Sequence, residues 1–126
     1  MEHEHSIIII RKENKYLNIY DERWQMNLFP NIKGHEEKKI KKYVEDELSI
    51  PIKEIKYLME KHHEKYSLSH KENRKYHHYF YEVIPSTLEK QEKGNFYTLE
   101  ELLKDPKEKE NNEDIINYIK EYYEKE

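Results

Sequence analysis

The chain has no cysteine, only two glycines and only four prolines. Without cysteine there can be no disulfide, no thiolate zinc site and no cysteine nucleophile. The longest apolar run is "IIII", far shorter than the roughly 20 residues that a membrane-spanning helix needs. The first residues, "MEHEHS", lack the basic region and apolar core of a signal peptide. We therefore expect a cytoplasmic protein that does not insert into membranes.

The chain also lacks a large net charge of one sign. Charged residues make up 40% of the chain, but the formal net charge is only −4, and lysines alternate with acids throughout. Proteins that bind nucleic acid through its phosphates need a basic tail or stripe. The sequence therefore argues against general nucleic-acid binding.

The apolar residues that are present gather in short runs. Their bulk comes from twelve tyrosines, three phenylalanines and one tryptophan among 126 residues, and such side chains bury a large area each. The length favours one domain. We expect a small compact domain with a charged surface.

The pattern of these runs predicts several strands. Ser6–Arg11 is continuous and β-branched, which is typical of a strand buried on both faces. "YLNIYD" alternates as its hairpin partner, and "ERWQMNLFP" adds a loop and a short strand. Further on, "EIKYLMEKHHEKYSLSH" places Ile55, Tyr57 and Met59 on one side, "KENR" reads as a turn, and 76–84 is a strand closed by Pro85.

Helices are predicted at three places. The segment "NIKGHEEKKIKKYVEDELSIP", 31–51, carries Ile40, Val44 and Leu48 at helical spacing, and Pro51 stops it. "TLEELL" begins with a capping-box pattern, and 112–124 has helical periodicity. The order of elements predicts an α/β protein with helices on both faces of a mixed sheet.

The stretch "YLNIYDERWQMNLFPNIKG…KKYVEDELSI" resembles the Nudix fold. That resemblance implies a single Nudix-like domain over 1–126. It also implies an α/β/α sandwich with a mixed β-sheet, one long helix after the first hairpin and two short C-terminal helices. In the family the first helix bears the Nudix box, G-x5-E-x7-R-E-U-x-E-E-x-G-U, where U is a bulky aliphatic residue.

Only part of this box is retained. Laid onto "KYVEDELSI", the box places Val44 and Ile50 at aliphatic positions and Asp46 and Glu47 at the paired acids. The departures are Lys42 for the arginine, Tyr43 for its neighbouring glutamate and Ser49 for the last glycine.

The front of the box departs further. Ile32 aligns with the first glycine and Gly34 with the isolated glutamate, and about four residues are missing before the helix. Glu36 and Glu37 are close enough in the sequence to substitute in space, although not by alignment.

The resemblance implies a divalent-metal site. In the family, carboxylates on one helical face hold Mg²⁺ or Mn²⁺ beside a diphosphate, and such ions prefer oxygen ligands. The candidate metal ligands are Asp46, Glu47 and Glu36, and the candidate catalytic residues are Glu47, Asp46 and Glu37. A neutral phenol at position 43 is a poor ligand, so the site is weakened. Candidate ligand-binding residues are Lys33, Lys42, Tyr43, Trp24 and Phe29.

Alternative interpretations stay open for these residues. Asp46 and Glu47 also fit a solvated face, with Lys42 and Asp46 as an i,i+4 pair. The pairs His62–His63 and His77–His78 lie on predicted strands, where at most one histidine of each pair can join a site. The sequence shows no third zinc ligand that converges with them.

The functional hypothesis is a Nudix-like domain that recognises a nucleotide or nucleoside diphosphate derivative with weak or no hydrolysis. The same stretches look similar to Nudix domains of bacterial defence systems that signal through nucleotide second messengers. The alternatives are an active metal-dependent pyrophosphohydrolase and a protein-interaction domain with a tyrosine-rich surface. A protein partner and a homodimer are both open.

Overall fold

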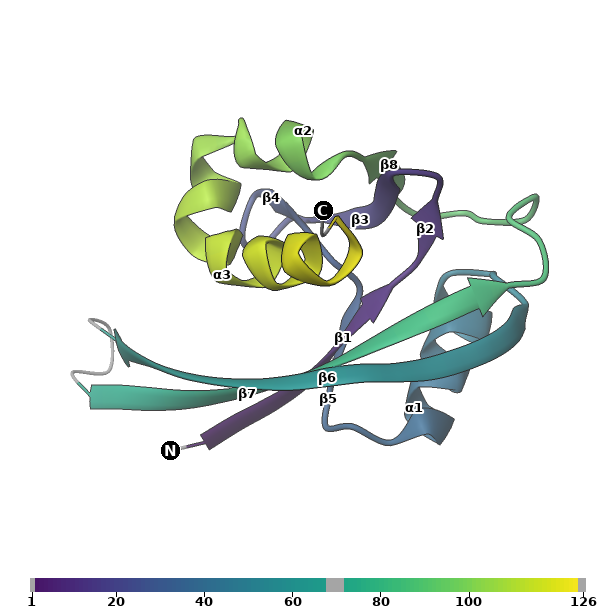
Figure 1. The fold of residues 1–126 in the computed structure, drawn as a ribbon. Coiled ribbons are helices and arrows are strands. Elements are labelled where there is room, and N and C mark those ends of the chain that lie inside the picture. The colour runs from purple at the N-terminus through teal and green to yellow at the C-terminus, as the bar shows by residue number, and fades with distance from the viewer. Residues whose placement is uncertain (1, 68–71, 125–126) are drawn as a thin grey trace. The chain divides into compact units, whose positions relative to one another are not determined.

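The computed structural model describes residues 2–67 and 72–124. The chain divides into two compact units. The first comprises Met1–Ile10 and Pro30–Lys93, and the second comprises Arg11–Phe29 and Gly94–Glu126. Figure 1 shows the elements of both units.

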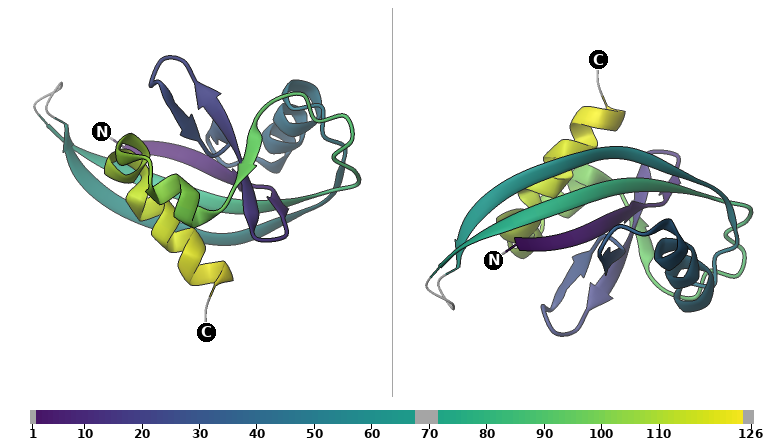
Figure 2. Two further views of the ribbon diagram at one scale, coloured as in Figure 1. Left: turned by 90° about the horizontal axis from the view of Figure 1, so that it is seen from above. Right: turned by 90° about the horizontal axis from the view of Figure 1, so that it is seen from below.

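The first unit is built on a four-stranded mixed sheet. Its strands are β1 (Glu2–Ile9), β5 (Asn31–Lys33), β6 (Ile52–Ser67) and β7 (Glu72–Pro85). Their order is β5-β1-β7-β6, with β1 parallel to β7 and the other neighbours antiparallel. Both views in Figure 2 show β7 between β1 and β6. The prediction of a mixed sheet is therefore confirmed.

The apolar run at the end of β1 is buried as predicted. All residues from Ser6 to Ile10 are buried, which agrees with a strand covered on both faces. The strand begins earlier than predicted, at Glu2, and it ends at Ile9, while Arg11 already belongs to β2.

The strands β6 and β7 form a long hairpin whose register changes within β6. Tyr57 pairs with Tyr81 but Met59 pairs with Phe80, so the register shifts by one residue at Leu58. Paired residues lie on the same face of a sheet and alternate along each strand. The prediction that Tyr57 and Met59 share a side was therefore wrong, because the irregularity inverts the alternation.

The predicted turn "KENR" was also misplaced. Glu72–Arg74 belong to β7, and Lys71 lies outside the described residues. The later strand predicted for 76–84 is confirmed within β7.

The first helix is shorter than predicted. It comprises α1 (Glu37–Lys42) and a π-helical turn, η1 (Tyr43–Glu47). Residues 31–33 form β5 instead, because their backbone pairs with β1. The buried stripe of Ile40, Val44 and Leu48 is confirmed.

The second unit contains β2 (Arg11–Lys12), β3 (Lys15–Asp21), β4 (Met26–Leu28) and β8 (Asn95–Tyr97). Strand β3 pairs antiparallel with each of the others. Gly94 allows β8 to reach β3: its φ is 87°, and an added Cβ would lie 2.6 Å from the carbonyl oxygen of Asn18. In the described residues, the predicted hairpin of "YLNIYD" with the strand Ser6–Arg11 is found only at Arg11, because β3 pairs with Arg11 and Lys12 of β2 while β1 pairs with β5 and β7.

Two helices complete the second unit. In α2 (Leu99–Leu103) the predicted capping box is present, with Thr98 and Glu101 satisfying each other's backbone amides. Helix α3 (Pro106–Tyr123) begins earlier than the predicted residue 112, because Asp105 caps it and Pro106 takes the first turn. With 18 residues, α3 is longer than α1, which reverses the predicted lengths. None of the helices in the described ranges has the length and apolar character to cross a bilayer.

An acidic side chain is enclosed in the second unit. Glu108, on α3, is fully buried. Burial, and to a lesser extent the nearby Asp105 carboxylate, raises its pKa from 4.5 to about 7, although the Asn112 side chain opposes the shift. The ionised form is therefore disfavoured in the folded protein.

We predict that Glu108→Gln stabilises the protein above neutral pH. The folded-state pKa is raised, so the carboxyl costs nothing below its unfolded pKa of 4.5 and costs progressively more as the pH rises through about 7. At pH 8 the variant should gain on the order of 2–3 kcal/mol in free energy of unfolding, and at pH 4 the gain should vanish. Urea unfolding at both pH values measures this difference, with the exposed Glu110→Gln as control. An equal gain at both pH values would contradict the prediction.

Candidate functional site

The chain enters helix α1 through a turn held by β1. Gly34 has a φ of 85°, in the left-handed region that favours glycine. Its amide donates to the carbonyl of Glu4 at 2.9 Å, and its carbonyl accepts from Ser6 Oγ at 2.7 Å. The start of the helix is therefore tied to an interior strand of the sheet.

His35 attaches the same turn to β7. Its imidazole stacks on the ring of Tyr79 with 4.3 Å between centroids, and its carbonyl accepts from the Tyr81 hydroxyl at 3.2 Å. Tyr79 and Tyr81 therefore share a face of β7. Burial and a hydrogen bond to Glu60 raise the pKa of Tyr79 to about 12, so the phenol stays neutral at any physiological pH.

Glu36 and Glu37 lie at the beginning of the helix. Both are exposed, and Glu36 forms an ion pair with Lys39 at 3.8 Å. The Tyr81 pKa is raised by burial and then by the Glu37 carboxylate, which puts Glu37 on the side of the helix that faces β7. Glu37 therefore lies near the Tyr81 hydroxyl, whereas Glu36 pairs with Lys39.

The other acids lie at the far end of the helix, in η1. Tyr43 is half-buried, and its pKa is raised by burial and then by the Glu47 carboxylate. Glu47 therefore lies near Tyr43, and Asp46, in the same turn, is exposed.

The predicted metal-binding and catalytic roles of the four acids stay predictions. The residues concerned lie at both ends of the helical segment, with Glu36 and Glu37 at the start of α1 and Asp46 and Glu47 in η1.

A lysine from the loop after β7 reaches this end of the helix. The ammonium group of Lys93 lies 3.7 Å from a carboxylate oxygen of Glu47, and both side chains are more than half exposed. The amide of the neighbouring Glu92 also donates to the carbonyl of Leu48 at 3.4 Å. By contrast, no ion pair joins Lys42 to Asp46 within the described ranges.

No local pattern in the sequence indicates the contact of Lys93 with Glu47. Along the chain, the β6–β7 hairpin and the loop after it separate Lys93 from Glu47. Lysines are also frequent along the whole chain. Only the folded arrangement of the loop after β7 selects this lysine.

Two further candidate ligand-binding residues are Lys33 of the first unit and Phe29 of the second. Lys33 is exposed at the end of β5, opposite His5 in the register. Phe29 is only 3% exposed and packs edge-on against Tyr16 at 6.4 Å between ring centroids. Its placement is that of a core side chain of the second unit, and gives its predicted ligand role no support.

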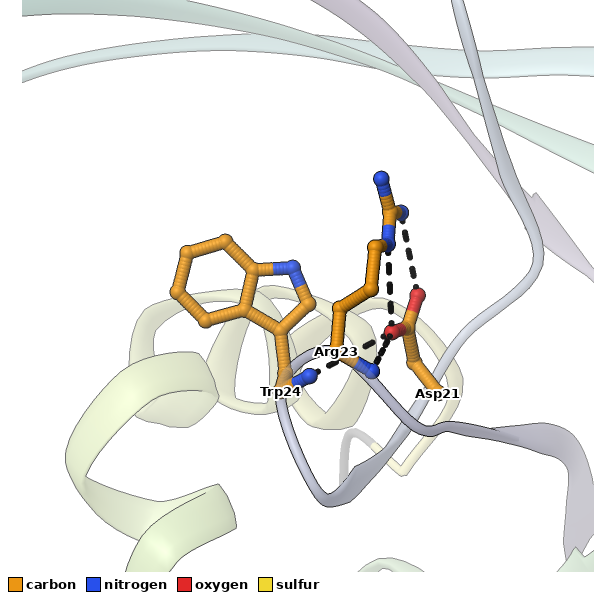
Figure 3. A network of polar contacts seen from close by, with 3 residues as sticks. All are labelled: Asp21, Arg23 and Trp24. Atoms are coloured by element: carbon orange, nitrogen blue, oxygen red, sulfur yellow. Dashed lines mark hydrogen bonds and ion pairs between the residues drawn. The ribbon is translucent and has the colours of Figure 1, made fainter.

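Trp24 is presented by the β3–β4 hairpin of the second unit. Figure 3 shows how Asp21 shapes this turn: its Oδ1 accepts from the amides of Arg23 and Trp24 at 2.8 and 3.3 Å. The Arg23 guanidinium donates to the same carboxylate and holds the pKa of Asp21 below its usual value. The Trp24 side chain remains 58% exposed, so its predicted role in ligand binding stays a prediction.

Two of the four paired histidines come together on the sheet. His62 and His77 are direct partners across β6 and β7, and their rings lie 4.2 Å apart at 83°. His78 points to the other face, where it is buried beside Phe80. The side chain of His63 lies outside the described residues. The structure therefore brings one histidine of β6 and one histidine of β7 into contact on the same face of the sheet.

The helix end has a backbone feature that bears on the motif. Ser49 adopts a φ of 56°, and the amide of Ile50 closes the turn onto the carbonyl of Val44 at 3.2 Å. A left-handed residue directly after a helix is usually glycine. Ser49 is the position that the resemblance assigned to the last glycine of the box, so the backbone there has the conformation that glycine favours.

Solved structures with known folds resemble this chain closely in architecture. A MutT protein from Bacillus halodurans superposes with a TM-score of 0.65 at 11% identity, covering 93% of this chain and 81% of that one. A NUDIX hydrolase from Nitrosomonas europaea gives 0.61 at 10% identity, covering 98% and 89%. The Ap4A hydrolase of C. elegans gives 0.53 at 12% identity, covering 82% and 86%. The chain has a Nudix fold.

At these identities the Nudix fold is what the similarity establishes. No family model matches the sequence, and no curated protein matches it either. The predicted fold class is confirmed. The order of elements along the chain predicted this fold, although the sequence identity to the solved structures is only 10–12%.

We predict that Ser49→Gly stabilises this Nudix domain. A side chain in the left-handed region costs roughly 1 kcal/mol, part of which is offset because glycine gains freedom in the unfolded chain. The variant should gain about 0.5 kcal/mol in free energy of unfolding, measured in urea at pH 7. The control Ser49→Ala keeps the Cβ and should give no gain. Stabilisation by alanine equal to that by glycine would contradict this explanation.

Proposed function

We propose that this Nudix domain binds a nucleotide or nucleoside diphosphate derivative through the acids of η1 and hydrolyses it slowly or not at all. The fold supports the ligand class. Two of the similar structures are named as hydrolases, and one of these names Ap4A, a dinucleoside polyphosphate, as its substrate. A small-molecule phosphate ester is therefore the first class to test.

The observation that supports the proposal of weak hydrolysis is the side chain at position 43. Tyr43 is half-buried, and both burial and the Glu47 carboxylate raise its pKa, so it presents a neutral phenol. A carboxylate at this position would contribute charge beside Glu47. The phenol contributes none, and it is a poor ligand for Mg²⁺ or Mn²⁺.

The remaining acids fit a single weakly held ion. Asp46 and Glu47 are exposed and offer carboxylate oxygens, which are the donors that hard divalent ions prefer. When bound, Mg²⁺ or Mn²⁺ would neutralise phosphate charge. Lys93 competes for Glu47, because it already forms an ion pair with that carboxylate. These residues can hold a diphosphate near one ion, but they lack the charge for a cluster of ions.

The narrower form of the proposal is that the ligand is a nucleotide second messenger. It rests on the resemblance of the sequence to Nudix domains of bacterial defence systems. Cyclic oligonucleotides therefore belong in the ligand panel beside dinucleoside polyphosphates and nucleoside diphosphate sugars.

We expect one of these ligands to stabilise the domain in the presence of Mg²⁺. At a ligand concentration 100 times its Kd, stabilisation of about 2.7 kcal/mol should raise Tm by about 10 °C for a chain of this size. The double variant Asp46→Asn, Glu47→Gln should lose most of the shift, while Glu36→Gln should keep it. Chromatography of the same mixtures detects products. Rapid turnover by the unmodified chain would instead establish an active pyrophosphohydrolase.

We also expect Tyr43→Glu to raise hydrolysis. The substitution returns a carboxylate beside Glu47, and it should increase Mn²⁺-dependent product formation by at least about tenfold from the ligand that binds. Tyr43→Gln is the matched control, since it has the same length as glutamate without the charge. If glutamate and glutamine give equal rates, the missing charge at position 43 is not the reason for weak activity.

A further inference from the structure

A group of metal-binding side chains lies on the β6–β7 hairpin, away from the acids of η1. Glu60, His62 and His77 each offer a ligand atom, and these atoms all lie within 4.8 Å of one another. Glu60 and His62 are two residues apart on β6, and His77 is the direct partner of His62 on β7. All three side chains therefore project from the same face of the sheet.

The distances suit a single tetrahedral ion. Zinc–ligand bonds of about 2.1 Å place two ligands of a tetrahedral site about 3.4 Å apart. The Nε2 atom of His62 lies 3.3 Å from Oε1 of Glu60, so this edge is already formed. The ring of His77 meets that of His62 edge-on with 4.2 Å between centroids, and its ligand atom lies within 4.8 Å of the other two.

Neighbouring residues orient these ligands and favour a cation. The hydroxyl of Tyr79 donates a hydrogen bond to the carboxylate of Glu60, which is its partner across the hairpin. Glu4 pairs with His77 from the β1 side and brings a further carboxylate to the same face. The cluster is also open to solvent, since the His62 side chain is 53% exposed, so an ion can enter without any rearrangement of the backbone.

The donor set indicates which ion. Imidazole nitrogen suits zinc and related transition metals, whereas Mg²⁺ and Ca²⁺ prefer oxygen ligands. Two histidines and one carboxylate are a set that zinc uses when it keeps a position open for water or another ligand. We propose that Glu60, His62 and His77 form a site for a zinc-class transition-metal ion, which links β6 to β7. This site is separate from the η1 acids and does not depend on the proposed nucleotide ligand.

The experiment is a calorimetric titration of the full chain with zinc chloride. The unmodified chain should bind one equivalent at this site, and His62→Ala and His77→Ala should each weaken that binding at least tenfold. Glu60→Gln should weaken zinc binding less, because the uncharged amide oxygen can still coordinate the ion. Circular dichroism checks that each variant is folded, and Ala at the exposed position 62 is expected to be tolerated.

Matched controls separate this site from the rest of the molecule. His3→Ala removes an imidazole from the opposite face of the same sheet, where its ring stacks on Tyr76, and should leave zinc binding within twofold of the unmodified chain. The double variant Asp46→Asn, Glu47→Gln should do the same, and millimolar Mg²⁺ should not displace the zinc. The proposal is overturned if the unmodified chain binds no zinc saturably, or if His62→Ala and His77→Ala both bind it as tightly as the unmodified chain.

Discussion

The parallel pairing of β1 with β7 is the constraint on which the first unit depends. It aligns Glu4 with His77, Ser6 with Tyr79 and Ile8 with Tyr81. Through Ser6 and Glu4, β1 fixes the turn at Gly34, and through its tyrosines β7 fixes His35. The helix with its acids and the face with its histidines are thus positioned by one strand pair. The burial of the apolar end of β1 holds that pair together, since apolar burial is the dominant favourable term in folding.

The η1 turn shows how a single neutral group can change the chemistry of a helix. Divalent ions are held by charge as much as by geometry, and a phenol next to a carboxylate supplies neither charge nor a good oxygen ligand. The tyrosine is more bulky and less polar than glutamate, so it is half-buried against the protein rather than directed to solvent. Its burial then makes ionisation harder still. This neutral, half-buried phenol is the reason for which the proposed function is binding rather than rapid hydrolysis.

Much of the fold could be predicted from residue patterns. The Ile40–Val44–Leu48 stripe, the capping box at Thr98 and the buried run in β1 all follow from local periodicity and are found in the structure. Local patterns did not predict that residues 31–33 would pair with β1, because that pairing is decided by a strand distant in sequence. The π-helical turn was also missed, since the apolar spacing of its flanks is compatible with an ordinary α-helix. The early start of α3 had a signal in "DP", an acidic cap followed by proline.

The candidate sites were predicted less completely. The Asp46–Glu47 pair was found from the motif, but its ion pair with Lys93 depends on a distant loop. Glu60 was missed as a companion of the histidines, although the pattern E-x-H on one strand was visible. Recognising it required the hairpin register, in which position 62 meets position 77.

The irregularity at Leu58 has a consequence for how this hairpin tolerates change. Before it, Tyr57 opposes Tyr81, and that alignment, if continued, would bring His62 opposite Tyr76 and turn it to the far side of the sheet. Because Leu58 is left out of the pairing, His62 meets His77 instead. Deletion of Leu58 would therefore make the ladder regular and keep the two imidazoles opposite each other. By contrast, a residue inserted into the ladder between Met59 and His62 would bring Lys61 opposite His77 and turn His62 to the other surface.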